Sequence, residues 1–407
     1  MTKASFGFIV AGGLLYIVAN QTQIGWLYLL DAIIWSLLVL SVVLPWYNLK
    51  SLQVEHQVLV PAPTLRQPLL GGPMEDEAVE VKLKVTNNGR LAGYFIKVLM
   101  DCPFEQPEKQ HRAFLVPILS PRSATTFSYM AACYRRGHYA ALSATLQSSG
   151  PLGLITRRRI VDLPLNLTVY PTYYQMEGLP VSEPAWADWG HAVRNSAAAD
   201  FYGSKEYQHG DPLKHIHWRN TARLGTFMIK EFEQTSHGSV TVAFETSHNF
   251  GIGKETTLEY SIKIAASLAK LCADSGHSID IITGTTYLNK AGWRGAMDYL
   301  AHLEVEVGSA LAEWMATPAP DQVAVVIVPT IETKLIPILS QLIDRVRGIV
   351  LVLLEGFSPD EVPHEFLGKL KGGNLEIISC SQGNLALAIK NLGDSLFLAG
   401  KVPASMG

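Results

Sequence analysis

Charged side chains are scarce in this sequence, and its first 46 residues have almost none. Asp, Glu, Lys and Arg make up 17% of the 407 residues, whereas an average soluble domain contains roughly a quarter. Between Phe6 and Trp46 the single formally charged side chain is Asp31. An uncharged stretch of this length is typical of a segment that crosses a membrane.

The sequence also has no excess of positive charge. Its 33 Lys and Arg against 36 Asp and Glu give a formal net charge of -3. A protein that binds nucleic acid through the phosphate backbone needs a strongly basic surface. The composition therefore predicts no nucleic-acid partner.

Cysteines are few and far apart. The four are Cys102, Cys133, Cys272 and Cys380, with no C-x-x-C pair among them. This spacing excludes the usual zinc-site patterns and a disulfide-rich scaffold. We predict reduced thiols inside hydrophobic cores, as is usual in a cytosolic compartment.

Two apolar runs near the N-terminus predict a pair of membrane helices. The second, residues 27–44, lies between Trp26 and Trp46, and aromatic residues are common at membrane interfaces. The first, residues 4–19, is short for a span and taken alone would also fit a signal peptide. Ile17 occupies a position where cleavage needs a small residue, and a full second span follows at once, so we favour a helical hairpin.

The lysines at the outer ends of this hairpin predict its orientation. Lys3 and Lys50 flank the two runs, while the linker 20–25 is polar and uncharged. Because positive residues favour the cytoplasmic side, we expect a multi-pass protein of the cell membrane with its globular domains in the cytoplasm. Asp31, near the start of the second span, is interpreted as interfacial rather than functional.

From residue 52 to about residue 170 the hydrophobic pattern has period two, as in half-buried β-strands. Asn88-Gly89 predicts a tight hairpin turn with 94–99 as the returning strand, and a second hairpin is expected to join 125–134 to 138–146. Short strands between Pro- and Gly-rich turns indicate a β-sandwich. The triplet Arg157-Arg158-Arg159 would suit contact with anionic lipid or a solvated loop, and we favour the loop.

After residue 239, strands and helices alternate. Near-continuous apolar runs predict buried strands at 240–244, 278–282, 323–328, 349–354 and 375–379. Thr256 and Glu259 have capping-box spacing, and the helix that follows them places apolar side chains on one face. This alternation is typical of a mostly parallel, doubly wound α/β sheet.

The stretch GIGKET at 251–256 has some features of a nucleotide-binding loop, but it is incomplete. His248 and Glu255 stand where a P-loop needs Gly and Ser or Thr. Thr256 stands where a dinucleotide fingerprint needs its third Gly. No G-x-S-x-G or H-E-x-x-H sequence occurs either, which removes the common hydrolase and zinc-protease templates.

Three histidines lie close together in sequence. His215 and His217 would face the same side of a strand, which suits a metal pair, and His209 is nearby. No third ligand of suitable spacing accompanies them, so we favour a structural role.

An ordered set of motifs between residues 201 and 233 resembles the signature of one bacterial family, domain of unknown function 58. The motifs are FYGSKEY at 201–207, GDP at 210–212, HWR at 217–219, AR at 222–223 and KEFE at 230–233. The order of segments, with two membrane helices, a β-sandwich, this signature and a von Willebrand factor type A-like domain, is also similar to the family's. The signature positions are Tyr207, Gly210, Asp211, His217, Trp218, Arg219, Arg223 and Lys230.

The patterns and the resemblance together predict five segments. These are a transmembrane hairpin at 1–47, a β-sandwich at 48–170, the signature segment at 171–237, the von Willebrand type A-like α/β domain at 238–395 and a tail at 396–407. In the signature, Asp211 could pair with Arg223 while Trp218 fills a joint between the domains. A docking site for a partner is the other interpretation, and we favour the joint.

The resemblance also implies a position for a divalent metal. Von Willebrand type A domains hold one at the end of the first strand with a D-x-S-x-S motif. Here the matching residues are Glu245, Ser247 and Asn249, and only Ser247 keeps the pattern, while Pro329-Thr330 replaces a later Asp. We therefore expect no metal and no other cofactor, and expect Ser247, His248 and Asn249 to act as hydrogen-bonding groups toward a partner.

Members of the family are often encoded beside MoxR-type AAA+ ATPases. The resemblance thus implies a non-enzymatic, membrane-tethered interaction or adaptor protein that works with a cytosolic ATPase of this type in assembly or cell-envelope processes. The alternative is a membrane-bound hydrolase that uses Asp211 with His215 or His217 as acid and base.

Overall fold

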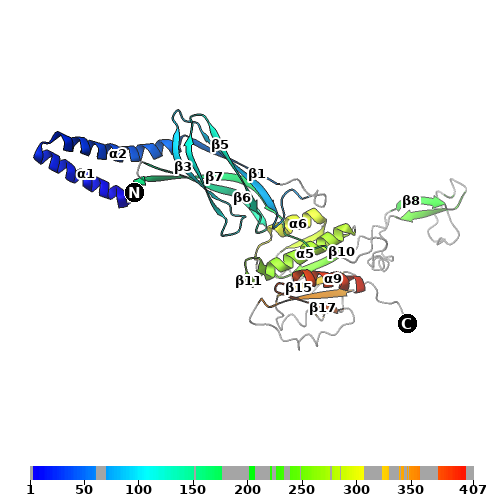
Figure 1. The fold of residues 1–407 in the computed structure, drawn as a ribbon. Coiled ribbons are helices and arrows are strands. Elements are labelled where there is room, and N and C mark those ends of the chain that lie inside the picture. The colour runs from blue at the N-terminus through cyan, green and yellow to red at the C-terminus, as the bar shows by residue number, and fades with distance from the viewer. Residues whose placement is uncertain are drawn as a thin grey trace. The chain divides into compact units, whose positions relative to one another are not determined.

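The computed structural model shows a chain that divides into two compact units, Met1–Thr172 and Tyr173–Gly407 (Figure 1). It describes residues 3–60, 70–150, 153–176, 201–206, 221, 226–232, 239–247, 249–275, 277–284, 286–306, 323–329, 339, 341–342, 346, 348–357 and 375–399. Each unit has buried apolar residues of its own.

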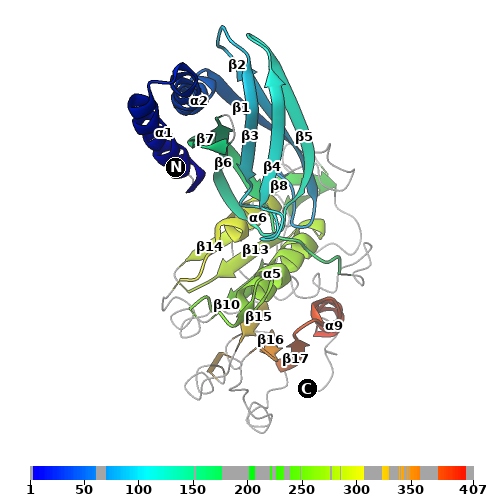
Figure 2. The same cartoon turned by 60° about the vertical axis from the view of Figure 1, so that its left-hand side comes forward.

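The first unit begins with two antiparallel helices, α1 (Lys3–Thr22) and α2 (Gly25–Lys50), which lie side by side in Figures 1 and 2. By length and composition both could cross a membrane, and their most apolar windows have mean hydropathy of 1.3 and 2.4. The two apolar runs therefore form a helical pair as predicted, and α2 continues past the second run to Lys50.

Small residues allow the two helices to approach closely. Buried positions recur every seven residues on each helix: Ser5, Gly12 and Ala19 on α1, and Asp31, Leu38 and Pro45 on α2. A methyl group added at Gly12 would lie 3.2 Å from the side chain of Ile34 and 3.3 Å from that of Trp35. Close packing through small residues is the usual way in which apolar helices associate. Asp31 lies in this seam and is 7% exposed.

Two antiparallel sheets follow α2. The first has the order β1-β2-β5 and the second the order β4-β3-β6-β7. The strands are β1 (Leu52–Leu59), β2 (Ala78–Asn87), β3 (Gly93–Asp101), β4 (His111–Leu119), β5 (Ala124–Ala132), β6 (Gly137–Ser149) and β7 (Thr156–Val169). Alternate residues of both sheets, such as Val81 and Leu83 from β2 and Val98 from β3, form one buried apolar cluster. The period-two pattern of the sequence is the origin of this shared core.

Both predicted hairpins are wrong in their pairing. β2 pairs with β1 and β5, and β3 pairs with β4 and β6, so the turn after Asn87 carries the chain from one sheet to the other. The segment between β5 and β6 does the same, because these strands also lie in different sheets. The period-two pattern marks which face of a strand is buried, and it does not specify the neighbouring strand.

The second unit contains a six-stranded sheet of order β14-β13-β10-β15-β16-β17. The strands are β10 (Ser239–Phe244), β13 (Ser278–Ile282), β14 (Tyr287–Ala291), β15 (Val323–Val328), β16 (Gly348–Glu355) and β17 (Leu375–Ser381). All neighbours are parallel except β13 and β14. The five predicted strands and their mostly parallel arrangement are therefore confirmed.

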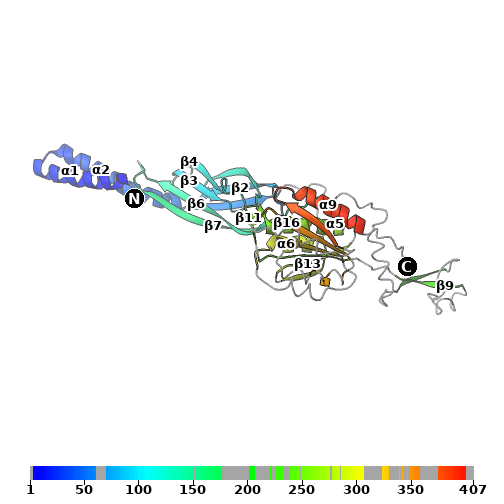
Figure 3. The same cartoon turned by 90° about the horizontal axis from the view of Figure 1, so that it is seen from below.

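Helices α5 (Thr257–Asp274), α6 (Trp293–His302) and α9 (Leu385–Ala399) accompany this sheet, and α5 contacts both of the others (Figure 3). Thr256 caps α5, since its Oγ1 accepts a hydrogen bond of 3.3 Å from the backbone N–H of Glu259. The predicted cap is confirmed. The stretch 251–256 forms a two-stranded hairpin, β11 (Gly251–Ile252) and β12 (Glu255–Thr256), and a further pair is formed by β8 (Phe201–Glu206) and β9 (Met228–Phe232).

Candidate functional site

The carboxyl ends of four parallel strands meet at one edge of the α/β sheet. β10 ends at Phe244, β15 at Val328, β16 at Glu355 and β17 at Ser381, and these strands are neighbours in that order. We call this the carboxyl edge. In open α/β sheets, ligands and partners bind outside this edge, because the loops that follow the strands gather there.

Directly after β10, the side chains are engaged with one another and with nearby backbone. The Ser247 hydroxyl donates a hydrogen bond to the Glu245 carboxylate. Thr246 is fully buried, and its Oγ1 donates to the backbone oxygen of Glu306 at 2.9 Å. These contacts fix the loop after β10 against the segment that follows α6.

Asn249 is exposed, but its amide oxygen faces the start of α5. Oδ1 accepts a hydrogen bond of 3.3 Å from the backbone N–H of Leu258 and one of 3.5 Å from the Thr257 hydroxyl. Phe250 and Thr257 also exchange hydrogen bonds of 3.1 and 2.9 Å. The Asn249 oxygen that the sequence offers to a partner therefore satisfies a helix terminus instead.

Tyr260 is a further member of the carboxyl edge that the sequence did not indicate. Its hydroxyl donates to the Glu255 carboxylate and accepts a hydrogen bond of 2.8 Å from the Gly383 N–H. Its ring meets that of Phe357 edge-on, with centroids 4.9 Å apart. Burial, followed by the hydrogen bond to Glu255, raises the pKa of Tyr260 to about 12. Tyr260 thereby joins α5 to the loops after β16 and β17.

The β11–β12 hairpin projects an apolar side chain at this edge. Ile252 is 89% exposed. Gly251 has φ of +106°, and a methyl group there would lie 2.0 Å from the Glu255 oxygen, so only glycine fits. The hairpin thus holds the exposed Ile252 side chain in a fixed position.

The arrangement does not fit a metal centre of the von Willebrand type. Glu245 is the one carboxylate among the matching positions, Ser247 is bonded to it, and the Asn249 oxygen faces α5. Pro329 follows β15 and is buried, and Thr330 lies outside the described residues. Within the described ranges, no group of three or more His, Cys, Asp or Glu side chains is arranged to hold an ion. The expectation of no metal stays a prediction.

Most of the signature lies outside the part of the chain that the structure describes. This applies to Tyr207, His209, Gly210, Asp211, His215, His217, Trp218, Arg219, Arg223 and His248. Lys230 belongs to β9, where it is paired with Ser204 of β8. The proposed Asp211–Arg223 pair and the histidine roles therefore remain predictions.

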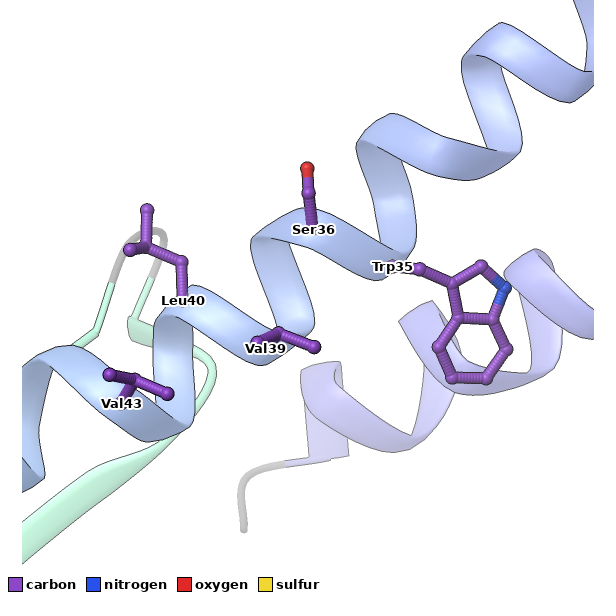
Figure 4. Close-up of a pocket in the computed structure, with 5 residues that line it drawn as sticks. All are labelled: Trp35, Ser36, Val39, Leu40 and Val43. Atoms are coloured by element: carbon purple, nitrogen blue, oxygen red, sulfur yellow. The ribbon is translucent and has the colours of Figure 1, made fainter.

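An apolar hollow of about 390 Å³ lies on α2 in the first unit (Figure 4). It is lined by Trp35, Ser36, Val39, Leu40 and Val43. These side chains come from the most apolar helix of the chain, and a lipid acyl chain would fill such a surface without any specific recognition.

All four cysteines are free and buried, as expected. Burial raises the pKa of each thiol to about 12. A neutral, buried thiol is a poor nucleophile and a poor metal ligand, so none of the four belongs to a reactive site.

Two of the solved structures that are similar to this chain show how weak the likeness is. The putative ApaA protein from Bordetella pertussis is 14% identical, with a TM-score of 0.19 over 28% of this chain and 93% of that one. A GH20 exo beta-N-acetylglucosaminidase from Vibrio harveyi is 7% identical, with a TM-score of 0.21 over 75% and 57%. Both TM-scores are too low to support an argument about fold or activity.

Comparison of sequences is more informative. Uncharacterized protein YeaD from Bacillus subtilis (strain 168) is 30% identical over 122 residues, which are 28% of this chain and 29% of that protein. The chain thus matches less than a third of the length of this relative. Residues 203–332 match the family described as Protein of unknown function DUF58. The resemblance inferred from the signature is therefore confirmed for the segment 203–332, which matches the DUF58 family model.

Proposed function

We propose that this chain is a membrane-tethered, non-enzymatic interaction protein that docks a partner protein at the carboxyl edge of its α/β unit. In this proposal α1 and α2 are the anchor, the two antiparallel sheets are a β-sandwich that carries the anchor, and the α/β unit is a von Willebrand type A-like recognition domain. The globular units are cytoplasmic, as Lys3 and Lys50 favour.

The observation that carries the proposal is Ile252. An isoleucine that is 89% exposed at the tip of a fixed hairpin gains free energy when a partner covers it. The polar side chains of Glu245, Thr246, Ser247 and Asn249 are held by internal hydrogen bonds, so they shape the surface. A pre-shaped surface with an apolar centre suits protein docking.

We propose a MoxR-type AAA+ ATPase as the partner, because the family resemblance implies one. The hydrolase alternative depends on Asp211, His215 and His217, which lie outside the described residues. No observation on the described part of the chain favours it.

Anchoring is tested by fractionation of the full chain. We expect it to remain with membranes after high-salt and carbonate washing, because α1 and α2 bury apolar surface in the bilayer. A reporter fused after Gly407 should behave as cytoplasmic. Release of the intact chain by carbonate would contradict the anchor, and a periplasmic signal would reverse the orientation.

Docking is tested with the detergent-solubilised full chain and a purified MoxR-type ATPase from the same organism. We expect Ile252→Ser to weaken binding by about tenfold or more, since an isoleucine side chain buried at an interface contributes roughly 1.5–3 kcal/mol. Leu115→Ser is the matched control, because Leu115 is 59% exposed but lies on β4 of the other unit. Binding that is absent in the unmodified chain, or equal in both variants, would contradict this docking surface.

A further inference from the structure

We infer that the end of the β-sheet unit next to α2 is a second membrane contact, which binds the phosphates of anionic phospholipids. This inference rests on the proposed membrane anchor. The surface consists of the turns 88–92 and 120–123, residues 150 and 153–155 of the β6–β7 connection, and the strand residues beside them, and we call it the proximal end.

Strand register places these turns together. α2 ends at Lys50 and β1 begins at Leu52, so the start of β1 lies at the proximal end. The paired residues that connect the other strands to it are Leu52↔Asn87, Thr86↔Ala124, Gly93↔Leu119, Ile96↔Ser148 and Ser149↔Thr156. The turns after β2, β4 and β6 are therefore all on the side of α2.

The β6–β7 turn lies directly against α2 (Figures 1 and 3). A methyl group added at Gly150 would lie 2.5 Å from Ser41 Cα and 2.7 Å from the Ser41 backbone oxygen. Further along, Asn48 Nδ2 donates to Ser148 Oγ at 3.1 Å. This turn and the last turns of α2 are packed backbone to backbone.

Arg159 completes this contact. Its Nη1 donates to the backbone oxygens of Leu49 and Leu52 at 2.9 and 3.0 Å, so it satisfies the carboxyl end of α2. The sequence favoured a solvated loop for the three arginines; this is wrong, because all three belong to β7. Arg159 links the strand to the helix.

These contacts set the depth of the turn relative to the membrane. Ser41 precedes Trp46 by five residues, or about 8 Å of helix, so Gly150 lies that far inside the aromatic interface. Arg157 is level with Ser148, two residues from Gly150 on β6, or about 7 Å back along the strand. Ser148 also accepts the hydrogen bond from Asn48, so Arg157 lies level with the turn of α2 from Trp46 to Asn48, where headgroup phosphates are found.

The proximal end is basic. Its turns contain no acidic residue in 88–92, 120–123 or 150–155. The exposed arginines of this end are Arg90, Arg122, Arg157, Arg158 and Arg159. The first four form no ion pair within the described residues. The opposite end of the same sheets has both signs of charge, with the acidic Glu75, Asp76, Glu77, Glu105 and Glu108 and the basic Lys109, Arg112, Arg135 and Arg136.

Exposed apolar side chains accompany the arginines. Leu91, Phe95 and Ile118 are 61%, 66% and 61% exposed, and Ile160 beside Arg159 is 69% exposed. Lys50 lies over the Trp46 ring at 4.9 Å. Surfaces that enter the headgroup layer typically combine arginine with apolar and aromatic side chains. Anionic lipids attract such surfaces because of their positive charge.

A fluorescent thiol probe tests this contact in the full chain. The four native cysteines are buried, so Ile118→Cys provides a selective label at the proximal end, and Met130→Cys, on a residue 54% exposed near the far end of β5, provides the control label. Each labelled protein is reconstituted into vesicles of phosphatidylcholine or of phosphatidylglycerol that contain a trace of headgroup-nitroxide lipid. We expect the Ile118→Cys label to be quenched more in phosphatidylglycerol and the Met130→Cys label to show no lipid dependence.

The arginines are then neutralised as Arg90→Gln, Arg122→Gln and Arg157→Gln together, leaving Arg159 in place because it bonds the end of α2. Quenching in phosphatidylglycerol should fall to the phosphatidylcholine level. A matched variant with Lys82→Gln, Lys109→Gln and Arg135→Gln loses the same charge away from the proximal end and should keep the lipid dependence. Equal quenching in both lipids, or an equal loss in both variants, would overturn the inference.

Flotation of the same vesicles separates the two proposals. A chain that floats in both lipids but shows no lipid-dependent quenching retains the anchor and refutes the proximal contact. A chain that floats in neither refutes both.

Discussion

Asn87 is fully enclosed at the end of β2, where the chain passes from one sheet to the other. Its Nδ2 donates to the backbone oxygens of Leu91, Leu119 and Ser120 at 2.9, 3.1 and 3.3 Å. Its Oδ1 accepts from the Gly89 N–H at 2.9 Å. The Asn87 side-chain amide thereby provides hydrogen-bond partners for backbone groups of two separate turns.

We expect Asn87→Ala to lower the free energy of unfolding by about 2–4 kcal/mol, because buried carbonyl and amide groups lose their partner without access to water. Urea unfolding of the full chain in detergent measures this loss. Asn88→Ala is the control, since the Asn88 side chain is exposed and bonds only to the exposed Gln53 side chain among the described contacts. Equal losses in the two variants would contradict the role of Asn87.

Tyr260 predicts a dependence of stability on pH. Burial raises its pKa to about 12 from the ordinary 10.0. Between these values the unfolded chain releases the proton while the folded chain keeps it, so the free energy of unfolding falls as the pH rises through this window. Below pH 10 the hydroxyl is neutral in both states, and this contribution is fully present.

Tyr260→Phe removes the titrating group. We expect the variant to be less stable at pH 8, because the hydrogen bonds with Glu255 and Gly383 are lost. Between pH 10 and 12 the difference from the unmodified chain should shrink. Urea midpoints of the full chain across this range measure it, and a constant difference would show that the folded-state pKa is not raised.

At the scale of elements, the sequence predicts where strands and helices lie better than it predicts which strands pair. The five parallel strands were predictable because buried strands such as 323–328 are apolar throughout, and Thr256 marks the start of α5. The pairing of β2 and β3 was not predictable from Asn88-Gly89, because that turn type does not exclude a crossover between sheets. Two partners of Asn87, the backbone oxygens of Leu119 and Ser120, lie 32 and 33 residues away in sequence, so local patterns do not reveal them.

The candidate site shows the same limit. Glu245, Ser247 and Asn249 were found because a family motif supplied their spacing. Tyr260 was missed, since its contacts with Phe357 and Gly383 join segments about a hundred residues apart. Only the fold brings the loops after β16 and β17 to the start of α5.

The β6–β7 turn predicts a strong sensitivity at one glycine. We expect Gly150→Ala to lower the thermal midpoint of the full chain, because the new methyl group would lie 2.5 Å from the Ser41 backbone and force α2 and the turn apart. Gly71→Ala is the matched control, as nothing lies within 4 Å of a methyl group there. A thermal melt in detergent compares the two, and equal midpoints would show that the turn does not pack on α2.

At the scale of the whole molecule, the four buried thiols report on both units. Cys102 and Cys133 lie in the first unit, and Cys272 and Cys380 in the second. Burial raises the pKa of each to about 12 from 9.0. As the pH rises above 9, unfolded thiols ionise while folded ones stay protonated, so the protein loses stability toward pH 12.

We expect the native chain at pH 8 to react with a thiol reagent far more slowly than the urea-unfolded chain, since both exposure and thiolate formation are suppressed. Mass spectrometry of the modified peptides identifies which unit opens first. Rapid native labelling of any of the four would contradict the packing of that unit's core.

Ser51 alone separates the last residue of α2 from the first residue of β1. Arg159 of β7 also joins its strand to this junction, through hydrogen bonds to the backbone oxygens of Leu49 and Leu52. A load applied to the β sheets therefore meets no slack segment before it reaches the helical pair. In the proposed anchor it arrives as torque on α1 and α2, and a bilayer around them would resist it by deforming around a tilted helix. In mechanical terms the first 172 residues form a cantilever. A pull from a motor protein on such a beam would be felt by the membrane itself.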